Sequence, residues 1–390
     1  MTQATASLAV DSGTPVFDSP VAFMRPQLQP QDVEAAHEVL KSGMLRAAGK
    51  CAELEERFSA ATGAKHAMTC ANGTCALQLA YAPLFERGDE VLVPAWTYIA
   101  TASMLVAAGL KPIWVDSLED TMQIDVADAA KKITPNTKGI AATHLYGMPV
   151  DVNAVAELAK AHDLKVVYDC AQAHLSTVDG KGIGTFGDAC TYSFYATKNL
   201  GTGEGGMITV NDDGLAHKVA LLRSHGESDK YLPESIGFTY RMNDITGAIG
   251  CSRFDRLLAE PNARRAAADH YDRVRGAIDG VLPPTRTAGA DSAWHLYTAK
   301  LDLDQFTVDR DTFVAALKAE GVPTAIHYPR SLTRQPAFQD FVSEANGGHP
   351  PVADVLSTKV FSLPMHHELD GPTIERIGEA MAKVAAAYRR

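Results

Sequence analysis

Short apolar runs alternate with amphipathic stretches from Cys51 to Cys251, and this alternation restricts the fold more than any other feature. Strands buried on both faces read as short apolar runs, and helices that connect parallel strands cover both faces of the sheet. Ile99–Ala108 and Val152–Ala161 are expected to be such helices. The pattern predicts an α/β fold with a mostly parallel central sheet flanked by helices. The expected strands are Val91–Val93, Pro112–Val115, Gly139–Thr143, Lys165–Tyr168, Thr191–Phe194 and Met207–Val210.

The composition changes after about Phe254, where Ala- and Arg-rich stretches alternate with a few short apolar runs. Pro261–Ile278, Arg310–Glu320 and Pro372–Tyr388 are expected to be helices, and His295–Leu301 a strand. We therefore expect three parts: an N-terminal arm (1–50) packing on a small domain, a large domain (51–254) that binds the ligand, and a smaller α+β domain (255–390).

The chain has 390 residues, a net charge of −11, and 46% hydrophobic against 21% charged residues. The acidic balance argues against non-specific binding to nucleic acid or to acidic membranes. No stretch approaches the roughly 20 apolar residues that span a bilayer, and no basic segment precedes an apolar run as in a secretory signal. The 6 cysteines form no C-x-x-C pair. We expect a cytoplasmic protein with reduced thiols, no metal site, and neither a nucleic acid nor a membrane as partner.

Lys198 stands between an apolar run and a loop dense in glycine, within TYSFYATKNLGTGEGG (191–206). Lysine forms a Schiff base with an aldehyde cofactor, and it must lose its proton to do so. Lowering a lysine pKa from about 10.4 to about 7 costs roughly 4.6 kcal/mol, which burial or nearby positive charge must supply. Taken alone, this segment is more typical of a surface lysine in a turn, so the neighbouring motifs have to decide.

Asp169 directly follows the expected strand Lys165–Tyr168. The carboxyl ends of parallel strands are where such sheets bind ligands. A carboxylate there can pair with the pyridine nitrogen of a cofactor, or it can cap the following helix.

Two further segments lie at the same edge of the predicted sheet. Asn72, Gly73 and Thr74 open the expected helix Cys75–Phe85, a pattern typical both of a phosphate site and of an ordinary capped helix. Tyr98 follows a strand, where an aromatic ring can stack on a flat cofactor or simply pack.

In this order, the segments resemble the sugar aminotransferases of the DegT/StrS group, which are fold-type I pyridoxal phosphate (PLP) enzymes of the aspartate aminotransferase superfamily. The resemblance runs from about residue 20 to the C-terminus, and six motifs in the family's order make it specific. The motifs are NGT (72–74), PAWTYIAT (94–101), HLYG (144–147), YDCAQAH (168–174), SFYATKNLGTGEGG (193–206) and GFTYRMND (237–244), and FSLPMHHEL (361–369) also fits.

The resemblance assigns catalytic roles to two residues: Lys198 as the Schiff-base lysine and Asp169 as the partner of the pyridine nitrogen. It also implies a set of cofactor contacts, with Gln172 near the phenolic oxygen, Ser193, Gly73 and Thr74 at the phosphate, and Tyr98 stacked on the ring. Family members are homodimers with shared active sites, to which Gly237–Asp244 contributes.

Thr239 departs from the family, which commonly has Asn at this position. The Asn contacts the cofactor phosphate across the dimer, and a Thr hydroxyl is shorter with one donor. The contact is therefore lost, mediated by water, or supplied by Arg241 or Asn243.

The resemblance implies an aminotransferase that converts a keto-sugar, in nucleotide-linked form, to an amino-sugar with Glu or Gln as the amino donor. PLP would alternate with pyridoxamine phosphate, and Lys198 would carry the proton between carbons. A related branch that dehydrates sugars has His at the position of Lys198, so that reaction is disfavoured. Two alternatives stay open: an aminotransferase or aminodehydratase acting on a carbocyclic ketone (a ketocyclitol or aminoshikimate-type compound), and a non-catalytic PLP-binding regulatory protein.

Substrate contacts are the least defined part of the site. His327 and Tyr328 follow a short apolar run and could bond ring hydroxyls, although a structural histidine fits equally well. Arg241 is a candidate cation for a diphosphate, as are Lys230, Arg330 and Arg334, and each is also typical of a solvated surface charge. Nothing in the sequence identifies the ketone.

Overall fold

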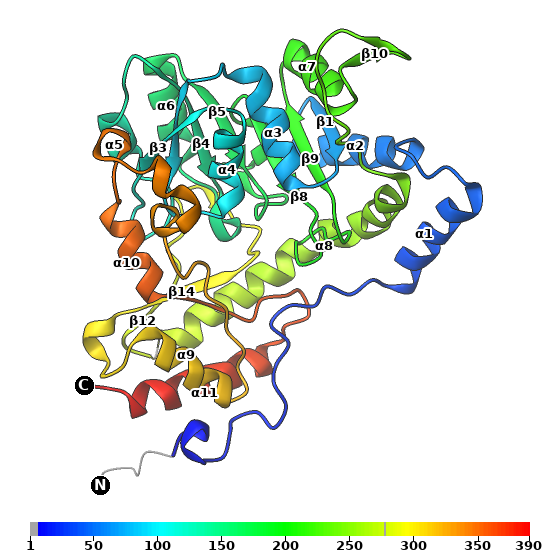
Figure 1. The fold of residues 1–390 in the computed structure, drawn as a ribbon. Coiled ribbons are helices and arrows are strands. Elements are labelled where there is room, and N and C mark those ends of the chain that lie inside the picture. The colour runs from blue at the N-terminus through cyan, green and yellow to red at the C-terminus, as the bar shows by residue number, and fades with distance from the viewer. Residues whose placement is uncertain (1–6, 277) are drawn as a thin grey trace.

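A seven-stranded sheet forms the centre of the larger of two domains in the computed structural model, which describes residues 7–276 and 278–390 (Figure 1). The strand order is β1-β9-β8-β5-β4-β2-β3, and β9 alone runs antiparallel to its neighbours. The mostly parallel sheet predicted from the sequence is confirmed. The strands are β1 (His66–Cys70), β2 (Glu90–Pro94), β3 (Lys111–Val115), β4 (Thr137–Thr143), β5 (Lys165–Asp169), β8 (Ala189–Ser193) and β9 (Gly206–Val210).

Helices cover both faces of this sheet. Successive side chains of a strand point to opposite faces, so they pack into two different hydrophobic cores. Val91 and Val93 pack into one cluster and Leu92 into the other. Buried apolar residues on both faces are what a parallel sheet between helices requires. The helices of this domain are α2 (Gly49–Thr62), α3 (Gly73–Leu84), α4 (Ile99–Ala107), α5 (Val126–Lys131), α6 (Val152–His162) and α7 (Asp213–Arg223).

The smaller domain combines a three-stranded antiparallel sheet with helices, as the sequence predicts. The sheet has the order β12-β14-β15, and its own core includes Phe313 and Ile377. Its elements are β12 (Val281–Leu282), β14 (Tyr297–Leu301), β15 (Val360–Leu363), α9 (Arg310–Ala319), α10 (Pro351–Lys359) and α11 (Gly371–Ala387). Five short strands form two further small sheets. One has the order β13-β6-β7, with β13 (Ala290–Asp291), β6 (Thr177–Val178) and β7 (Lys181–Gly182). The other is the pair of β10 (Glu227–Asp229) and β11 (Leu232–Pro233).

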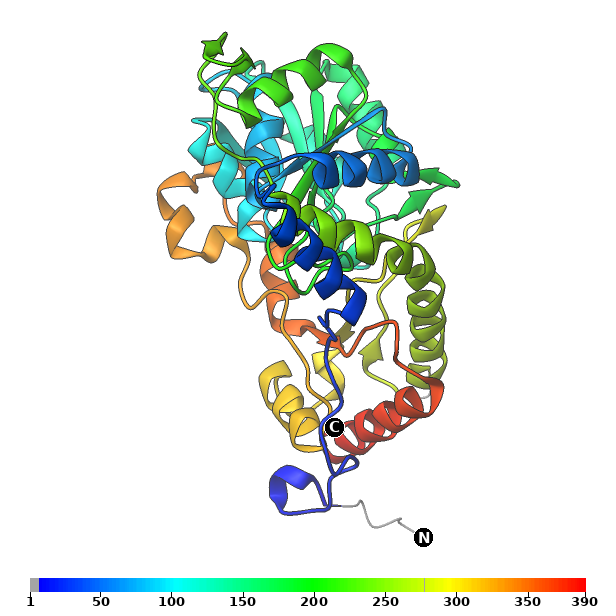
Figure 2. The same ribbon diagram turned by 90° about the vertical axis from the view of Figure 1, so that its right-hand side faces the viewer.

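One long helix, α8 (Asp244–Arg275), runs from the large domain into the small one through the expected boundary at residue 254. The sequence pattern instead places a helix start at Pro261, which lies inside α8. Figure 2 shows the helix bending along its length, as expected when a proline removes one backbone hydrogen bond.

The N-terminal arm runs along the small domain and then crosses to α8 (Figure 1). The backbone N–H of Val16 donates to the Glu320 carboxylate at 3.0 Å, and that of Phe17 donates to the Glu320 carbonyl at 3.1 Å. Helix α1 (Pro30–Ser42) then packs on α8, where the buried Asp32 accepts hydrogen bonds from Arg256.

Candidate active site

A cavity of about 770 Å³ lies at the carboxyl ends of β1, β2, β4, β5 and β8, where the large domain faces residues of the small one. This is the edge at which parallel sheets bind ligands. It brings together most of the candidate residues found in the sequence. The cavity is lined, among others, by Gly73, Thr74, Tyr98, Asp169, Gln172, Ser193, Lys198, His327 and Tyr328.

Asp169 and Lys198 reach the cavity from neighbouring strands. Asp169 is the last residue of β5 and pairs in register with Thr191 of β8, and the turn after β8 then leads to Lys198. The Asp169 carboxylate is buried and accepts hydrogen bonds from the Thr101 hydroxyl at 2.7 Å and from the Ala171 N–H at 3.0 Å. These bonds hold the carboxylate in a fixed orientation at the edge of the sheet.

Burial shifts the pKa values of both groups toward their neutral forms. It lowers the pKa of Lys198 to about 8, against the opposing charge of Asp169. Burial also raises the pKa of Asp169, opposed by the hydrogen bonds from Thr101 and Ala171 and by the charge of Lys198. Lys198 is therefore an amine that loses its proton far more readily than an exposed lysine, as attack on a carbonyl carbon requires.

The start of α3 lines the cavity as well. Gly73 is the first residue of this helix, and the Asn72 side chain caps it by accepting from the Cys75 N–H at 2.9 Å. A Cβ atom at Gly73 would lie 2.7 Å from the Cβ of Ser193, so only glycine fits there without displacing β8. The first N–H groups of a helix lack partners within it. Together with the hydroxyls of Thr74 and Ser193, they offer a site for an anion.

Comparison with known proteins identifies the chain's relatives. Residues 26–382 match the DegT/DnrJ/EryC1/StrS aminotransferase family. The chain belongs to this aminotransferase family. The resemblance seen in the motifs is thereby confirmed.

Three relatives of this aminotransferase have the following names. A "pleiotropic regulatory protein" of Geobacillus stearothermophilus is 36% identical over 93% of the chain and 96% of the relative. A UDP-N-acetyl-3-dehydro-alpha-D-glucosamine 3-aminotransferase of Acidithiobacillus ferrooxidans is 37% identical over 85% of the chain and 87% of the relative. The structure of S. venezuelae DesV, solved with a ketimine intermediate, is 32% identical and superposes with a TM-score of 0.88 over 94% of this chain and 99% of DesV.

Gln172 and several aromatic side chains line the aminotransferase cavity. The Gln172 Nε2 donates to the Tyr328 hydroxyl at 3.3 Å, and the Tyr98 and Tyr328 rings lie 6.1 Å apart. Tyr98 is 56% exposed in the single chain. Tyr195, which also lines the cavity, is 50% exposed. His327 faces the same cavity, and its Nδ1 lies 3.2 Å from the Ser362 hydroxyl.

Arg241 and Asn243 do not line this cavity in the single chain. The Asn243 side chain caps α8 by accepting from the Thr246 N–H, and Arg241 donates to the Ser224 hydroxyl at 2.7 Å. The Thr239 hydroxyl lies 2.9 Å from the His225 Nε2. The hydroxyl that replaces the family's Asn is thus engaged with a histidine of its own chain.

The other candidate cations are also away from the cavity. The Lys230 ammonium lies 5.0 Å from the centre of the Tyr231 ring, Arg334 is paired with Asp354, and Arg330 is exposed. Among residues 7–276 and 278–390, the cavity is lined by one lysine, Lys198, and by no arginine.

Several cavity residues are missing from the sequence-based set. Thr101 is missing too: it does not line the cavity itself, but its hydroxyl donates to the Asp169 carboxylate, and a threonine in the mostly apolar helix α4 is a usable signal for a buried contact. Phe23 and Met24 of the N-terminal arm also line the cavity, as do Glu204 and His295. No local pattern could have placed the arm residues there, because only the tertiary fold brings the arm across the domain edge.

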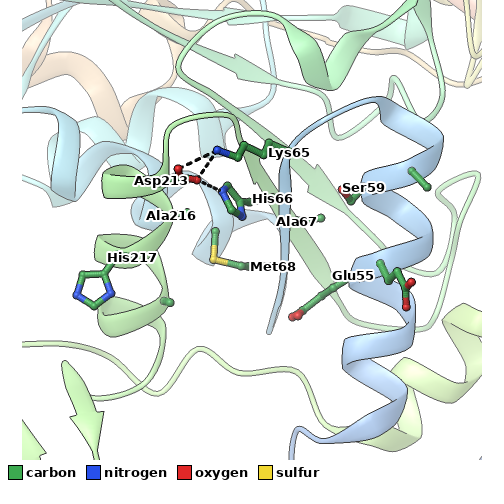
Figure 3. Close-up of a pocket in the computed structure, with 12 residues that line it drawn as sticks. Glu55, Ser59, Lys65, His66, Ala67, Met68, Asp213, Ala216 and His217 are labelled. Carbon is green, nitrogen blue, oxygen red and sulfur yellow. Dashed lines mark hydrogen bonds and ion pairs between the residues drawn. The ribbon is translucent and has the colours of Figure 1, made fainter.

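A second, more open hollow lies between α2, β1 and α7 (Figure 3). Two of its basic side chains are paired within it, because Lys65 and His66 both contact the Asp213 carboxylate, at 2.7 Å each. It contains none of the candidate residues from the sequence.

Proposed function

We propose that this aminotransferase converts the ketone of a nucleotide-linked sugar to an amine, with PLP as cofactor and Glu or Gln as the amino donor. The observation that carries the proposal is the buried pair of Lys198 and Asp169 on neighbouring strands, beside the anion site at Gly73. The names of the Acidithiobacillus relative and of other relatives that act on dTDP-linked sugars support the choice of substrate class.

The cavity residues fit PLP in charge and shape. The N-terminus of α3 with Thr74 and Ser193 would hold its phosphate, Asp169 its ring nitrogen, and Tyr98 one face of the ring. When bound, PLP supplies an aldehyde that takes an amino group from the donor and passes it to the acceptor. Because Asp169 is buried, its carboxylate would pair with the ring nitrogen at low effective dielectric and would keep that nitrogen protonated.

Lys198 is proposed to act as the base of the reaction as well as the cofactor anchor. With a pKa of about 8, its amine can take the proton from the α-carbon of the donor and return one near neutral pH. Because Lys198 lines the cavity, its amine would stand beside the bound donor, and the proton transfer would have the high effective concentration of an intramolecular step.

We further propose a homodimer in which each subunit completes the other's site. A diphosphate needs cations, and Lys198 is the one cation among the described residues lining the cavity. Arg241 and His225 lie on the segment between α7 and α8, which also carries the exposed apolar residues Tyr231 and Ile236 (82% and 93% exposed). A subunit interface at this segment would remove both apolar side chains from water. Sedimentation with Ile236→Asp tests the dimer: a wild-type monomer contradicts it.

The described part of the chain holds no helix long and apolar enough to cross a membrane. We propose a cytoplasmic enzyme, because all 6 cysteines are free thiols in the structure and 5 of them are buried.

A regulatory role is the second candidate, because the Geobacillus relative carries that name. The two are separated by a screen of L-glutamate and L-glutamine against nucleotide-linked keto-sugars, free keto-sugars and ketocyclitols, with product mass as the readout. An amino-sugar nucleotide is expected from wild type and from Lys138→Ala, which changes an exposed lysine, and not from Lys198→Ala. Turnover by Lys198→Ala would exclude the mechanism. Turnover of a ketocyclitol alone would show that the acceptor is a carbocyclic ketone and not a nucleotide-linked sugar. No turnover by wild type would favour the regulatory role.

A further inference from the structure

Tyr146 is a buried residue of the HLYG segment to which none of the roles above is assigned. It follows β4 in a short turn, Leu145–Gly147, and its backbone is left-handed with φ of 62° and ψ of 4°. A side chain makes this conformation costly, so it persists where the surroundings demand it, and such residues cluster at functional sites. Gly147 follows with φ of 98°, and a Cβ there would lie 2.9 Å from backbone atoms of Gln172 and His295.

The backbone of Tyr146 fixes the orientation of the Gln172 side chain. The Tyr146 N–H donates to the Gln172 Oε1 at 2.5 Å. Because the oxygen of the carboxamide faces Tyr146, its NH₂ group must face the other way, where it donates to the Tyr328 hydroxyl at 3.3 Å. The donor end of Gln172 is therefore directed to the cavity by an N–H on the next strand end.

The side chain of Tyr146 connects the large domain to the small one. Its hydroxyl accepts from the Trp96 Nε1 at 3.1 Å and donates to the His327 carbonyl. Its own carbonyl accepts from the Leu296 N–H at 3.2 Å. Two separate segments of the small domain, those leading to β14 and to Tyr328, are thus attached to this one residue.

We propose that Tyr146 is a positioning residue for the transamination site. From one N–H and one hydroxyl, it holds the Gln172 carboxamide and the His327–Tyr328 segment in a fixed relation to each other. Tyr146 itself does not line the cavity, so it acts through these groups and not on the substrate. The inference rests on the proposed function only in taking this cavity as the reaction site.

The substitution Tyr146→Phe tests the proposal, because it keeps the ring and the N–H and removes the hydroxyl alone. The His327 carbonyl then loses its donor, and the segment 325–328 should open more often. We expect amide hydrogen exchange of this segment in the cofactor-free enzyme to accelerate about tenfold, the equivalent of one hydrogen bond. We also expect the KM for L-glutamate to rise about tenfold while kcat changes less than about threefold, because the hydrogen bonds of Tyr146 within the described residues go to other groups than Lys198 and Asp169.

Tyr271→Phe is the matched control. Tyr271 is also a fully buried tyrosine whose hydroxyl donates to a backbone carbonyl, that of Pro364 at 2.9 Å, and it lies in the small-domain core away from the cavity. It should lower the melting temperature to a similar extent and leave both the exchange of 325–328 and the KM unchanged.

Unchanged exchange of 325–328 in Tyr146→Phe overturns the proposal, and so does an equal effect of both variants on that segment. If wild type fails to react with L-glutamate, the donor assignment is wrong, and the exchange comparison still decides the role of Tyr146.

Discussion

At the scale of single residues, the pKa of Lys198 is set by two opposing influences, burial that lowers it to about 8 and the charge of Asp169 that raises it. Capture of PLP needs the neutral amine, whose fraction grows as pH rises through the pKa. The rate of PLP capture by the cofactor-free enzyme should therefore increase with pH around a midpoint of about 8. Asp169→Asn removes the raising charge, so the midpoint should move to lower pH. Rapid-mixing absorbance measures both, and a midpoint that moves upward in the variant contradicts this account.

The Thr101 hydroxyl stabilises the ionised form of Asp169 with a bond of 2.7 Å. Hydrogen bonds to charged groups contribute about 1.5–3 kcal/mol. Thr101→Val keeps the shape and removes the bond, so the dissociation constant for PLP should rise about tenfold or more. Thr209→Val is the control, since its buried hydroxyl has no hydrogen-bond partner within the described residues. Equilibrium dialysis compares the two, and equal retention of PLP would show that Thr101 does not act on Asp169.

At the scale of elements, the first turn of α3 combines a phosphate-type helix start with a close contact to β8. Gly73→Ala places a methyl group 2.7 Å from the Cβ of Ser193, which forces the helix start away from the strand. We expect the affinity for inorganic phosphate and for PLP to fall at least about tenfold. Gly49→Ala is a matched control, because Gly49 is also the first residue of a helix and a Cβ there meets nothing within 4 Å. Calorimetric titration measures both affinities, and the same affinity in the two variants would show that α3 does not bind the anion.

The elements also show how far local patterns reach. The six apolar runs became β2, β3, β4, β5, β8 and β9, because a strand buried on both faces has few other compositions. β1 (His66–Cys70) escapes the pattern, since His66 and Ala67 are only half-buried at the edge of the sheet. The helix start expected at Pro261 is wrong for a physical reason: packing of Leu257 and Arg264 on either side keeps α8 continuous through the proline.

At the scale of the whole molecule, an ion pair with a fully buried carboxylate and a partly exposed guanidinium attaches the N-terminal arm to α8. Asp32 is fully buried and accepts two bonds from the Arg256 guanidinium, at 2.8 and 2.6 Å, and one from the Ser252 hydroxyl at 2.7 Å. Removing one partner of such a pair leaves the charge of the other without a counter-charge. Asp32→Ala should lower the free energy of unfolding by about 3 kcal/mol. Asp255→Ala, on the same helix but with a side chain that is 81% exposed, should cost less than about 1 kcal/mol.

Urea unfolding followed by circular dichroism measures both losses. If the two variants lose the same free energy, the arm is not held by the Asp32 pair. Because the pKa of Asp32 is lowered in the fold by the Arg256 bonds and other donors against its burial, the stabilisation is present above the unfolded pKa and is lost as pH falls below about 4.

By itself, the sequence determined the fold class, the family and the residues that stand at strand ends, because strand periodicity and motif order are local properties of the chain. Lys198, Asp169, Gly73 and Ser193 were all found in this way. Only the tertiary structure decided which groups complete the site: Thr101 behind Asp169, the arm residues at the cavity edge, and Tyr146 between the domains. These contacts join residues far apart in the chain, and their geometry depends on how the packed elements are oriented, which no local pattern records.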